Sequence, residues 1–145
     1  MKQKESAVKY FGEGKNCAQS ILLSFADELN FNQTQALNLA SGFGGGLAHN
    51  GKVCGAVSGA IMVLGLKYGS TGKTPAESKE ITFKKVNEFI TKFKQEFGSL
   101  DCKDLIDGID LMTEEGRAES KKRNTHDNIC SPIVAKAAEI ILEIN

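Results

Sequence analysis

The amino-acid sequence predicts an all-α fold, a compact single-domain bundle of about six to eight helices, several of them short, over residues 1–145. Apolar residues recur at spacings of three and four along much of the chain, which is typical of amphipathic helices. The two prolines both stand where a helix could begin. No segment alternates apolar and polar residues as a half-buried strand does. A chain of 145 residues can bury one core without disulfides.

The N-terminal part is expected to form three helices. The first covers residues 2–11, and the turn sequence GEGKN separates it from the second. Asn16 is the expected N-cap of the second helix, since its side-chain oxygen can accept from a free amide of the first turn. The apolar face of this helix consists of Ala18, Ile21, Leu22, Phe25 and Leu29. A short third helix is expected over residues 33–41, ending at Gly42.

The middle of the chain is expected to form two longer helices. The first of these covers residues 51–68 with Asn50 as its cap, and it contains the most apolar run of the sequence, AIMVLGL. The second covers residues 75–97, where Pro75 suits the first turn. Its apolar stripe consists of Phe83, Val86, Ile90, Phe93 and Phe97. This stripe predicts a core-facing surface or, alternatively, the seam of a homodimer.

The last third begins with a short helix expected over residues 101–106. Residues 113–127 contain eight charged residues and no large apolar side chain, so we expect them on the surface. In the final helix, Ser131 is the expected N-cap and Pro132 the first helical residue. The buried face of that helix should consist of Ile133, Val134, Ala137, Ile141 and Ile144.

The charges argue against several classes of function. Lys plus Arg and Asp plus Glu both number 18, so no broad field attracts nucleic acid or an anionic membrane. The basic cluster at residues 121–123 is expected to be a solvated surface. The N-terminal segment lacks the apolar core of a secretory signal, and residues 53–66 are too few to cross a bilayer. We therefore expect a cytoplasmic protein that does not span a membrane and does not bind nucleic acid.

The four cysteines are the main functional signal. Permanent disulfides are unusual in a reducing compartment, so the thiols are expected to be reactive, metal-bound or simply buried. Each stands near an expected helix start, where free amides and the helix dipole favour a thiolate: Cys17, Cys54, Cys102 and Cys130. In a bundle whose helices run alternately up and down, these four starts would share one end. The sequence thus predicts that the four sulfurs gather there.

Glycines surround Cys54. Those at positions 42, 44, 45 and 46 do not satisfy G-x-G-x-x-G in any register, and no predicted strand precedes them, so a dinucleotide fold is not indicated. Within the following helix, Gly55 and Gly59 with Ala56 and Ala60 form two rows of small residues. Such rows allow either a neighbouring backbone or a bound group to come close.

The sequence CGAVSG at residues 54–59, with one cysteine before it and two after it, resembles the C_GCAxxG_C_C family of redox-active proteins. The segments NCAQSIL and GFGGGLA, at residues 16–22 and 42–48, are also similar to that family. The family label writes GCA, whereas residues 53–56 here read VCGA. The resemblance implies that the four cysteines carry the family's redox chemistry. It makes Gly55, Ala56 and Gly59 the candidate cofactor-binding residues.

Some proteins similar to this family carry c-type haem. The resemblance to them implies that the four shared cysteines could instead hold an iron–sulfur centre. Covalent haem is excluded because its attachment needs C-x-x-C-H, whereas the closest cysteines, Cys102 and Cys130, are 28 positions apart. The same spacing removes the usual signature of a zinc site and of a thioredoxin-like dithiol.

Three functions remain open. In the first, Cys54 is the attacking thiol of a redox protein because its loop is the most open, Cys17 is its partner, and the external redox partner is unknown. In this reading we expect Cys54 to be among the most acidic thiols. In the second, all four thiolates bind an iron–sulfur cluster or zinc. In the third, the cysteines are incidental to a helical interaction module.

Other candidate groups are few. His49 and His126 could serve as metal ligands or proton donors beside a thiol, but we expect them on exposed loops without such a role. No Ser, His and Asp arrangement and no pair of carboxylates indicates a hydrolase.

Overall fold

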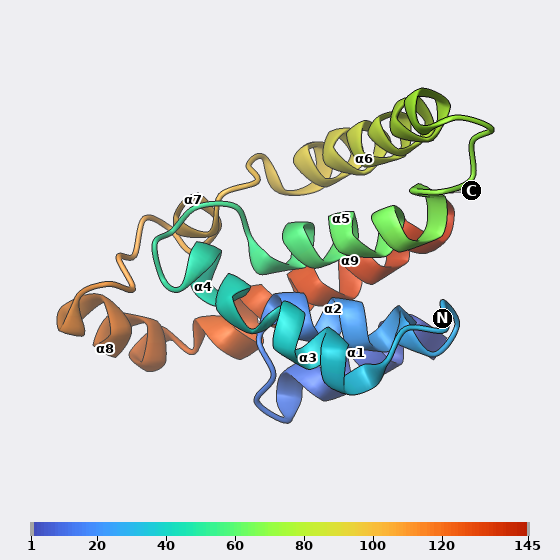
Figure 1. The fold of residues 1–145 in the computed structure, drawn as a ribbon. Coiled ribbons are helices and arrows are strands. Elements are labelled where there is room, and N and C mark those ends of the chain that lie inside the picture. Colours follow the sequence, from blue (N-terminus) through green and yellow to red (C-terminus); the bar gives the residue numbers. More distant parts are fainter. Residues whose placement is uncertain (1, 145) are drawn as a thin grey trace.

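The computed structural model describes residues 2–144 and confirms the all-α prediction (Figure 1). Within this range the chain forms helices, turns and loops, and its only β-type pairing is an isolated bridge between Val53 and Asp101. The helices in chain order are α1 (Lys2–Gly12), α2 (Cys17–Ala26), α3 (Gln33–Leu39), α4 (Gly44–Leu47), α5 (Gly55–Tyr68), α6 (Pro75–Phe97), α7 (Cys102–Leu105), α8 (Glu114–Arg123) and α9 (Ser131–Glu143). A 3₁₀ turn, η1 (Ser41–Phe43), precedes α4, and a π-helical turn, η2 (His126–Cys130), precedes α9.

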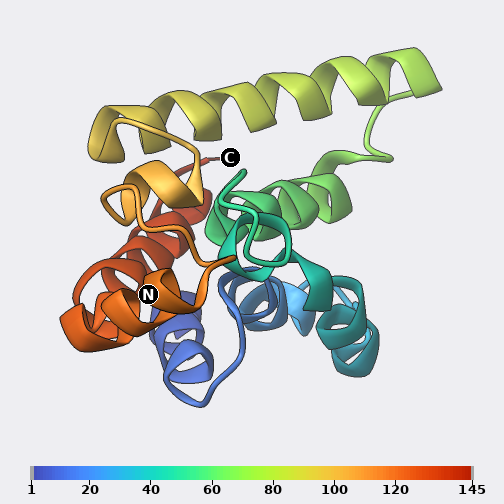
Figure 2. The same ribbon diagram turned by 90° about the vertical axis from the view of Figure 1, so that its left-hand side faces the viewer.

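The directions of the long helices determine where their first residues lie. Helices α2, α5 and α9 all begin at the same end of the bundle, on the left of Figure 1, while α1 and α6 run toward that end. The short helices α4 and α7 and the polar helix α8 surround the same end, which faces the viewer in Figure 2. Three of the four cysteine-bearing segments are thereby brought together by helix direction, and α7 adds the fourth.

The core lies between α1, α2, α5, α6 and α9. The predicted buried face of α9 is confirmed, since all five of its residues from Ile133 to Ile144 are at most 4% exposed. Ala18, Ile21, Leu22 and Phe25 of α2 are likewise buried, whereas Leu29 lies beyond the end of that helix and is partly buried. On α6 the predicted stripe is wrong at one position. Phe89 is fully buried and packs beside Phe93, while Phe83 is 57% exposed.

Two predicted helix starts are also wrong. The helix expected from residue 51 begins at Gly55, because Gly51 has φ 68° and Val53 is drawn into the bridge with Asp101. Asn50 therefore does not cap it, and its side-chain nitrogen donates to the Leu47 carbonyl instead. Ser131 does not cap α9, because it has helical angles of φ −60° and ψ −46° and continues directly from η2.

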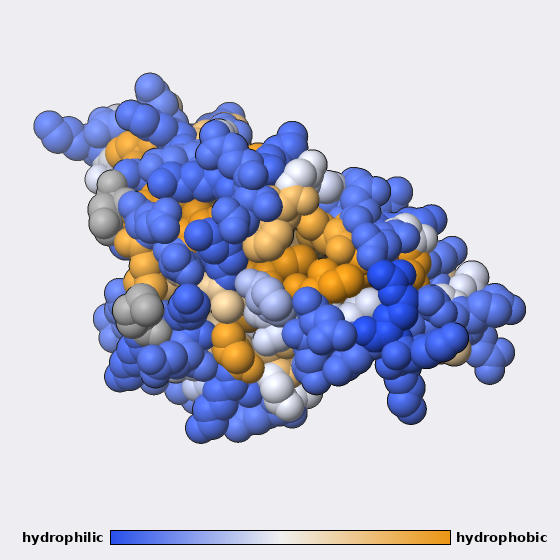
Figure 3. All heavy atoms as spheres, turned by 180° about the vertical axis from the view of Figure 1, so that it is seen from behind, coloured by the Kyte–Doolittle hydropathy of each residue, from blue (hydrophilic) through white to orange (hydrophobic). Residues whose placement is uncertain are grey.

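The surface follows the polarity of the sequence. On the face shown in Figure 3, polar side chains cover most of the molecule and apolar side chains reach the surface in the middle. Helix α8 has no buried residue, as expected for residues 113–127, although Thr125 just after it is only 4% exposed. No helix within residues 2–144 has both the length and the apolar character needed to cross a membrane.

Candidate functional site

All four cysteines line one small cavity at the end of the bundle where α2, α5 and α9 begin. Its volume is about 20 Å³, close to what a single water molecule occupies. Gly45, Ile106 and Ile133 complete part of its wall. Thiols that are far apart in the sequence are thus neighbours in the fold, as their placement near helix starts predicts.

Cys17 is held by the cap of α2. The Asn16 side-chain oxygen accepts from the Gln19 backbone amide at 2.8 Å, and the Gln19 side-chain oxygen accepts from the Asn16 amide at 3.0 Å. This reciprocal capping box satisfies two amides at the helix start and confirms the expected N-cap. The Asn16 side-chain nitrogen also donates to the carbonyls of Ala40 and Ser41, each at 3.2 Å. The first residue of α2 is therefore fixed to the chain that leaves α3.

Small residues of α5 bring α2 close to Cys54. A Cβ atom at Gly55 would lie 3.0 Å from the Cβ of Cys17, and one at Gly59 would lie 2.9 Å from the carbonyl oxygen of Ala18. Of the two roles considered for these rows, the structure shows the close approach of a neighbouring backbone. Gly55 also lines the cysteine cavity, and Ala56 and Gly59 are buried. The role of these three residues in cofactor binding stays a prediction.

Backbone pairing joins Cys54 to Cys102. The Cys54 amide donates to the Leu100 carbonyl and the Cys102 amide donates to the Lys52 carbonyl, both at 2.7 Å. These two hydrogen bonds flank the isolated bridge between Val53 and Asp101. The loop before α5 is thereby attached to the loop before α7, which places the two cysteines on the same cavity.

A left-handed turn accounts for the glycine-rich segment ahead of Cys54. Residues 45–49 all have positive φ, from 51° at Ala48 to 72° at His49, so the segment labelled α4 is not a regular right-handed helix. Gly46 meets this requirement without strain, and no side chain fits there, because its Cβ would lie 2.7 Å from that of Cys102. Leu47, Ala48 and His49 each cost about 1–2 kcal/mol in this conformation. Backbone strain of this kind concentrates at functional sites.

The thiols of Cys17 and Cys54 line the same cavity, and their interaction shifts their pKa values in opposite directions. The neighbouring Cys17 thiol lowers the pKa of Cys54, and the first-turn amides of Ala56 and Val57 add to this against the opposing effect of burial. The neighbouring Cys54 thiol raises the pKa of Cys17 well above its ordinary value, and burial and the negative charge of Cys54 raise it further. Of the two thiols, Cys54 is therefore the more acidic.

The other two thiols are kept neutral. Burial raises the pKa of Cys102 to about 12, and the charges of Cys54 and Cys130 add to the effect. Burial followed by the charge of Cys54 raises the pKa of Cys130 to about 11. The direction for Cys54 agrees with its expected acidity. For Cys17, Cys102 and Cys130 the expected thiolate is not favoured, because the neighbouring Cys54 and burial raise their pKa values.

The exposure of the cysteines differs from expectation. Cys54 is only 5% exposed and Cys102 only 9%, whereas Cys17 and Cys130 are partly accessible. The prediction that Cys54 lies in the most open loop is wrong, because the left-handed turn and the bridge to α7 fold that loop inward. An external molecule therefore meets Cys17 or Cys130 before it meets Cys54.

Comparison with known proteins agrees with the four-cysteine arrangement. A family model described as "Putative redox-active protein (C_GCAxxG_C_C)" matches residues 15–144. The chain belongs to this family. A curated protein of Archaeoglobus fulgidus, described as "Uncharacterized protein", is 31% identical over an alignment of 148 positions that spans 97% of this chain and 91% of that protein. No solved structure matches the chain. Membership of the C_GCAxxG_C_C family supports redox activity, and its chemical form has to be argued from the geometry.

The four cysteines share one cavity, but their arrangement does not match a metal site. Among residues 2–144 of this C_GCAxxG_C_C protein, no group of three or more His, Cys, Asp or Glu side chains is arranged so that it could hold a metal ion. The cavity itself has room for about one small ion, which is far less than an iron–sulfur cluster occupies. A four-thiolate site would thus require the cysteines to rearrange.

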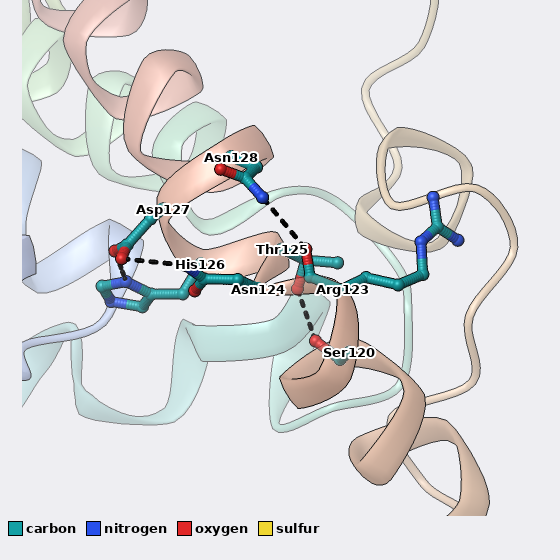
Figure 4. A network of polar contacts seen from close by, with 7 residues as sticks. All are labelled: Ser120, Arg123, Asn124, Thr125, His126, Asp127 and Asn128. Carbon is teal, nitrogen blue, oxygen red and sulfur yellow. Dashed lines mark hydrogen bonds and ion pairs between the residues drawn. The ribbon is translucent and has the colours of Figure 1, made fainter.

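A wide cleft of about 820 Å³ lies outside the small cavity, and Cys17, Cys102 and Cys130 form part of its wall. Both histidines are exposed, as expected, but both also line this cleft beside the thiols. The ring of His126 stacks on Phe11, with 3.9 Å between ring centroids and 7° between planes. Its Nδ1 contacts the Asp127 carboxylate at 2.9 Å (Figure 4). Sequence reasoning missed Phe11 and the wall from α8, because no local motif marks them.

Proposed function

We propose that this C_GCAxxG_C_C protein is a thiol–disulfide redox protein whose redox pair is Cys17 and Cys54. The position of both thiols on one small cavity carries the proposal, and the lowered pKa of Cys54 beside the Cys17 thiol supports it. A thiolate is the nucleophile of disulfide exchange, and a partner sulfur in contact with it can form the disulfide. Redox activity agrees with the description of the family.

The exposure of the two thiols determines their order of reaction. In the oxidised protein, an external thiolate attacks the sulfur of Cys17, which borders the cleft, and Cys54 leaves as a thiolate. A low pKa of the leaving thiol speeds this exchange, and the first-turn amides of α5 supply part of that lowering. A second external thiolate then attacks the mixed disulfide, and Cys17 leaves and takes up a proton. Two external thiols become one disulfide, and the protein disulfide becomes a thiol and a thiolate.

This order exchanges the roles expected from the sequence. Cys17 is the contact thiol, and buried Cys54 is the resolving thiol that attacks Cys17 when an external disulfide oxidises the protein. Cys102 and Cys130 line the same cavity as neutral thiols, so they are the nearest alternative partners.

Disulfide mapping tests the redox pair. The reduced protein is oxidised with one equivalent of a small disulfide, free thiols are alkylated, and cross-linked peptides are identified by mass spectrometry. We expect a Cys17–Cys54 link that persists in C102S and in C130S, while C17S and C54S lose reversible oxidation. A predominant Cys102–Cys130 link, or no intramolecular link in a folded protein, would overturn the proposal.

Zinc or iron–sulfur binding is the second candidate function, because all four thiols line one cavity. Metal analysis and the absorption spectrum of protein purified without oxygen test it. One zinc per chain or the absorption of an iron–sulfur centre would favour this candidate, and their absence together with the Cys17–Cys54 link would favour the dithiol. An interaction module is not proposed, since it would leave the cysteines scattered, whereas they share a cavity.

A further inference from the structure

The cleft above the cysteines differs in charge from the rest of the chain. Acidic and basic residues balance at 18 each over the full sequence. Among residues 2–144, however, the cleft is lined by three cationic side chains, Lys15, Arg117 and Lys121, and by no carboxylate. Lys15 already faces Glu13 at 3.6 Å. The unbalanced positive charge therefore comes mainly from α8.

Helix α8 presents one face to this cleft. Arg117, Ser120, Lys121 and Asn124 line it, at the spacings of three and four that place residues on the same side of a helix. The acidic residues of α8, which are Glu114, Glu115 and Glu119, do not line it. Within residues 2–144 neither Arg117 nor Lys121 forms an ion pair, although one Arg117 nitrogen donates to the Leu111 carbonyl at 2.9 Å. No residue of α8 is buried, so the position of this helix is not explained by its side chains packing into the hydrophobic core.

Polar contacts hold this wall in place. Arg123 at the end of α8 pairs with Asp107 at 2.6 Å, and the hydroxyl groups of Ser120 and Thr125 share a hydrogen bond. The Asn128 side chain donates to the Arg123 carbonyl at 3.0 Å, as Figure 4 shows. The cationic face of α8 is thereby kept over the end of the bundle that contains the thiols.

The size and polarity of the cleft suit a small molecule. Its volume of about 820 Å³ lies within the usual range for ligand pockets. Phe11, Ile106 and Leu111 supply apolar wall, next to the cationic side chains and the thiol of Cys17. A cleft lined by charge of one sign concentrates ligands of the opposite sign and raises their association rate.

We propose that this cleft selects small anionic thiols and disulfides as the redox partners of Cys17. The inference rests on the proposed thiol–disulfide function and adds a substrate class to it. An anionic disulfide enters beside Arg117 and Lys121, and the Cys17 sulfur, whose proton passes to Cys54, attacks one of its sulfur atoms. One anionic thiolate leaves. A Cys54 thiolate, formed as its proton is released to solvent, then attacks Cys17 and expels the second. The disulfide gains two electrons and the protein dithiol loses them.

Three disulfides that differ in charge test this selection: dithiodipropionate, which is anionic, bis(hydroxyethyl) disulfide, which is neutral, and cystamine, which is cationic. Each disulfide is used to oxidise the fully reduced protein, and the rate at which the Cys17–Cys54 disulfide forms is measured. This rate is divided by the rate at which the same disulfide reacts with free mercaptoethanol, which corrects for its intrinsic reactivity. We expect the normalised rates to fall in that order at low salt. Since salt screens charges over about 10 Å at 0.1 M, the differences should shrink as ionic strength rises.

Two variants of α8 make the test specific to the cleft. Lys121→Gln removes an exposed cation that lines it, and Lys122→Gln removes the neighbouring exposed cation that does not. We expect Lys121→Gln to slow oxidation by dithiodipropionate about two- to fivefold, the usual effect of one exposed charge pair, and to leave the neutral disulfide unaffected. Lys122→Gln should change neither rate by as much.

The outcomes separate the two proposals. If all three disulfides form the Cys17–Cys54 link at equal normalised rates, or if both variants behave alike, the anionic selection is wrong and the redox pair stands. If none of the three forms that link, the proposed redox pair itself is wrong.

Discussion

The close approach of α2 to α5 can be tested by adding one methyl group at Gly59. A Cβ there would lie 2.9 Å from the Ala18 carbonyl oxygen and 3.0 Å from the Ile21 Cβ, so Gly59→Ala has to push α2 outward. Gly65 of the same helix is the matched control, because a Cβ at that position meets nothing within 4 Å. Both substitutions replace glycine by alanine inside α5.

The magnitude follows from two opposing effects. Alanine is favoured over glycine in a helix interior by about 1 kcal/mol, and this gain applies to both variants. Overpacking a filled position costs about 1–3 kcal/mol and applies to Gly59→Ala alone. The free energy of unfolding of Gly59→Ala should therefore lie about 1–3 kcal/mol below that of Gly65→Ala. At about 4 °C per kcal/mol for a chain of this length, their melting temperatures should differ by about 4–12 °C.

Urea unfolding and thermal melts of both variants, followed by circular dichroism, measure this difference. The pKa of the Cys54 thiol supplies a second measurement, since displacement of α2 draws Cys17 away from Cys54 and raises that pKa in Gly59→Ala alone. Equal stabilisation of both variants would refute the close approach. If the two variants differ in stability but have the same Cys54 pKa, then α2 is displaced near Gly59 without moving Cys17.

Four further predictions follow from the site. Cys17→Ala removes the thiol that lowers the pKa of Cys54, so that pKa should rise, as ultraviolet thiolate absorbance against pH would show; an unchanged value would argue against the interaction of the two thiols. Because folding raises the pKa of Cys102 to about 12 and of Cys130 to about 11, the stability that these thiols supply is complete below pH 9.0 and is lost as the pH rises through these values. Unfolding free energies from pH 8 to 11 should thus fall less steeply in the C102S/C130S variant than in the unmodified protein, and parallel curves would contradict the burial effect. Since no group of three or more potential ligands within residues 2–144 is arranged to hold a metal ion, a chelator should leave the melting temperature unchanged, and a fall of several degrees would support the metal alternative. Ala48→Gly should relieve left-handed strain and raise the unfolding free energy by about 0.5–1 kcal/mol in urea, whereas destabilisation would show that no strain is stored there.

Features encoded by neighbouring residues could be predicted from the sequence. The bounds of α6 agree with the expected range 75–97, because Pro75 suits a first turn and Gly98, at φ 83°, ends the helix. The Asn16 cap and the buried face of α9 are also correct, since capping and amphipathic spacing act within a few residues. The sequence also indicated that the helix starts, and with them the thiols, meet at one end.

The chemistry of the site required the tertiary structure. Whether Cys54 is exposed or buried depends on how the glycine-rich turn packs against Lys52 and Cys102. The same packing favours the left-handed turn over the extended loop that glycines would also allow. The neighbouring thiols of Cys17 and Cys54 require α2 to pack closely on α5, and the cationic cleft requires α8 to lie at the end of the bundle. The sequence alone thus determined which residue types were present and where helices form. Packing between distant segments decided which thiol is exposed and which has a lowered pKa, because burial and charge interactions depend on distances in space that local sequence does not contain.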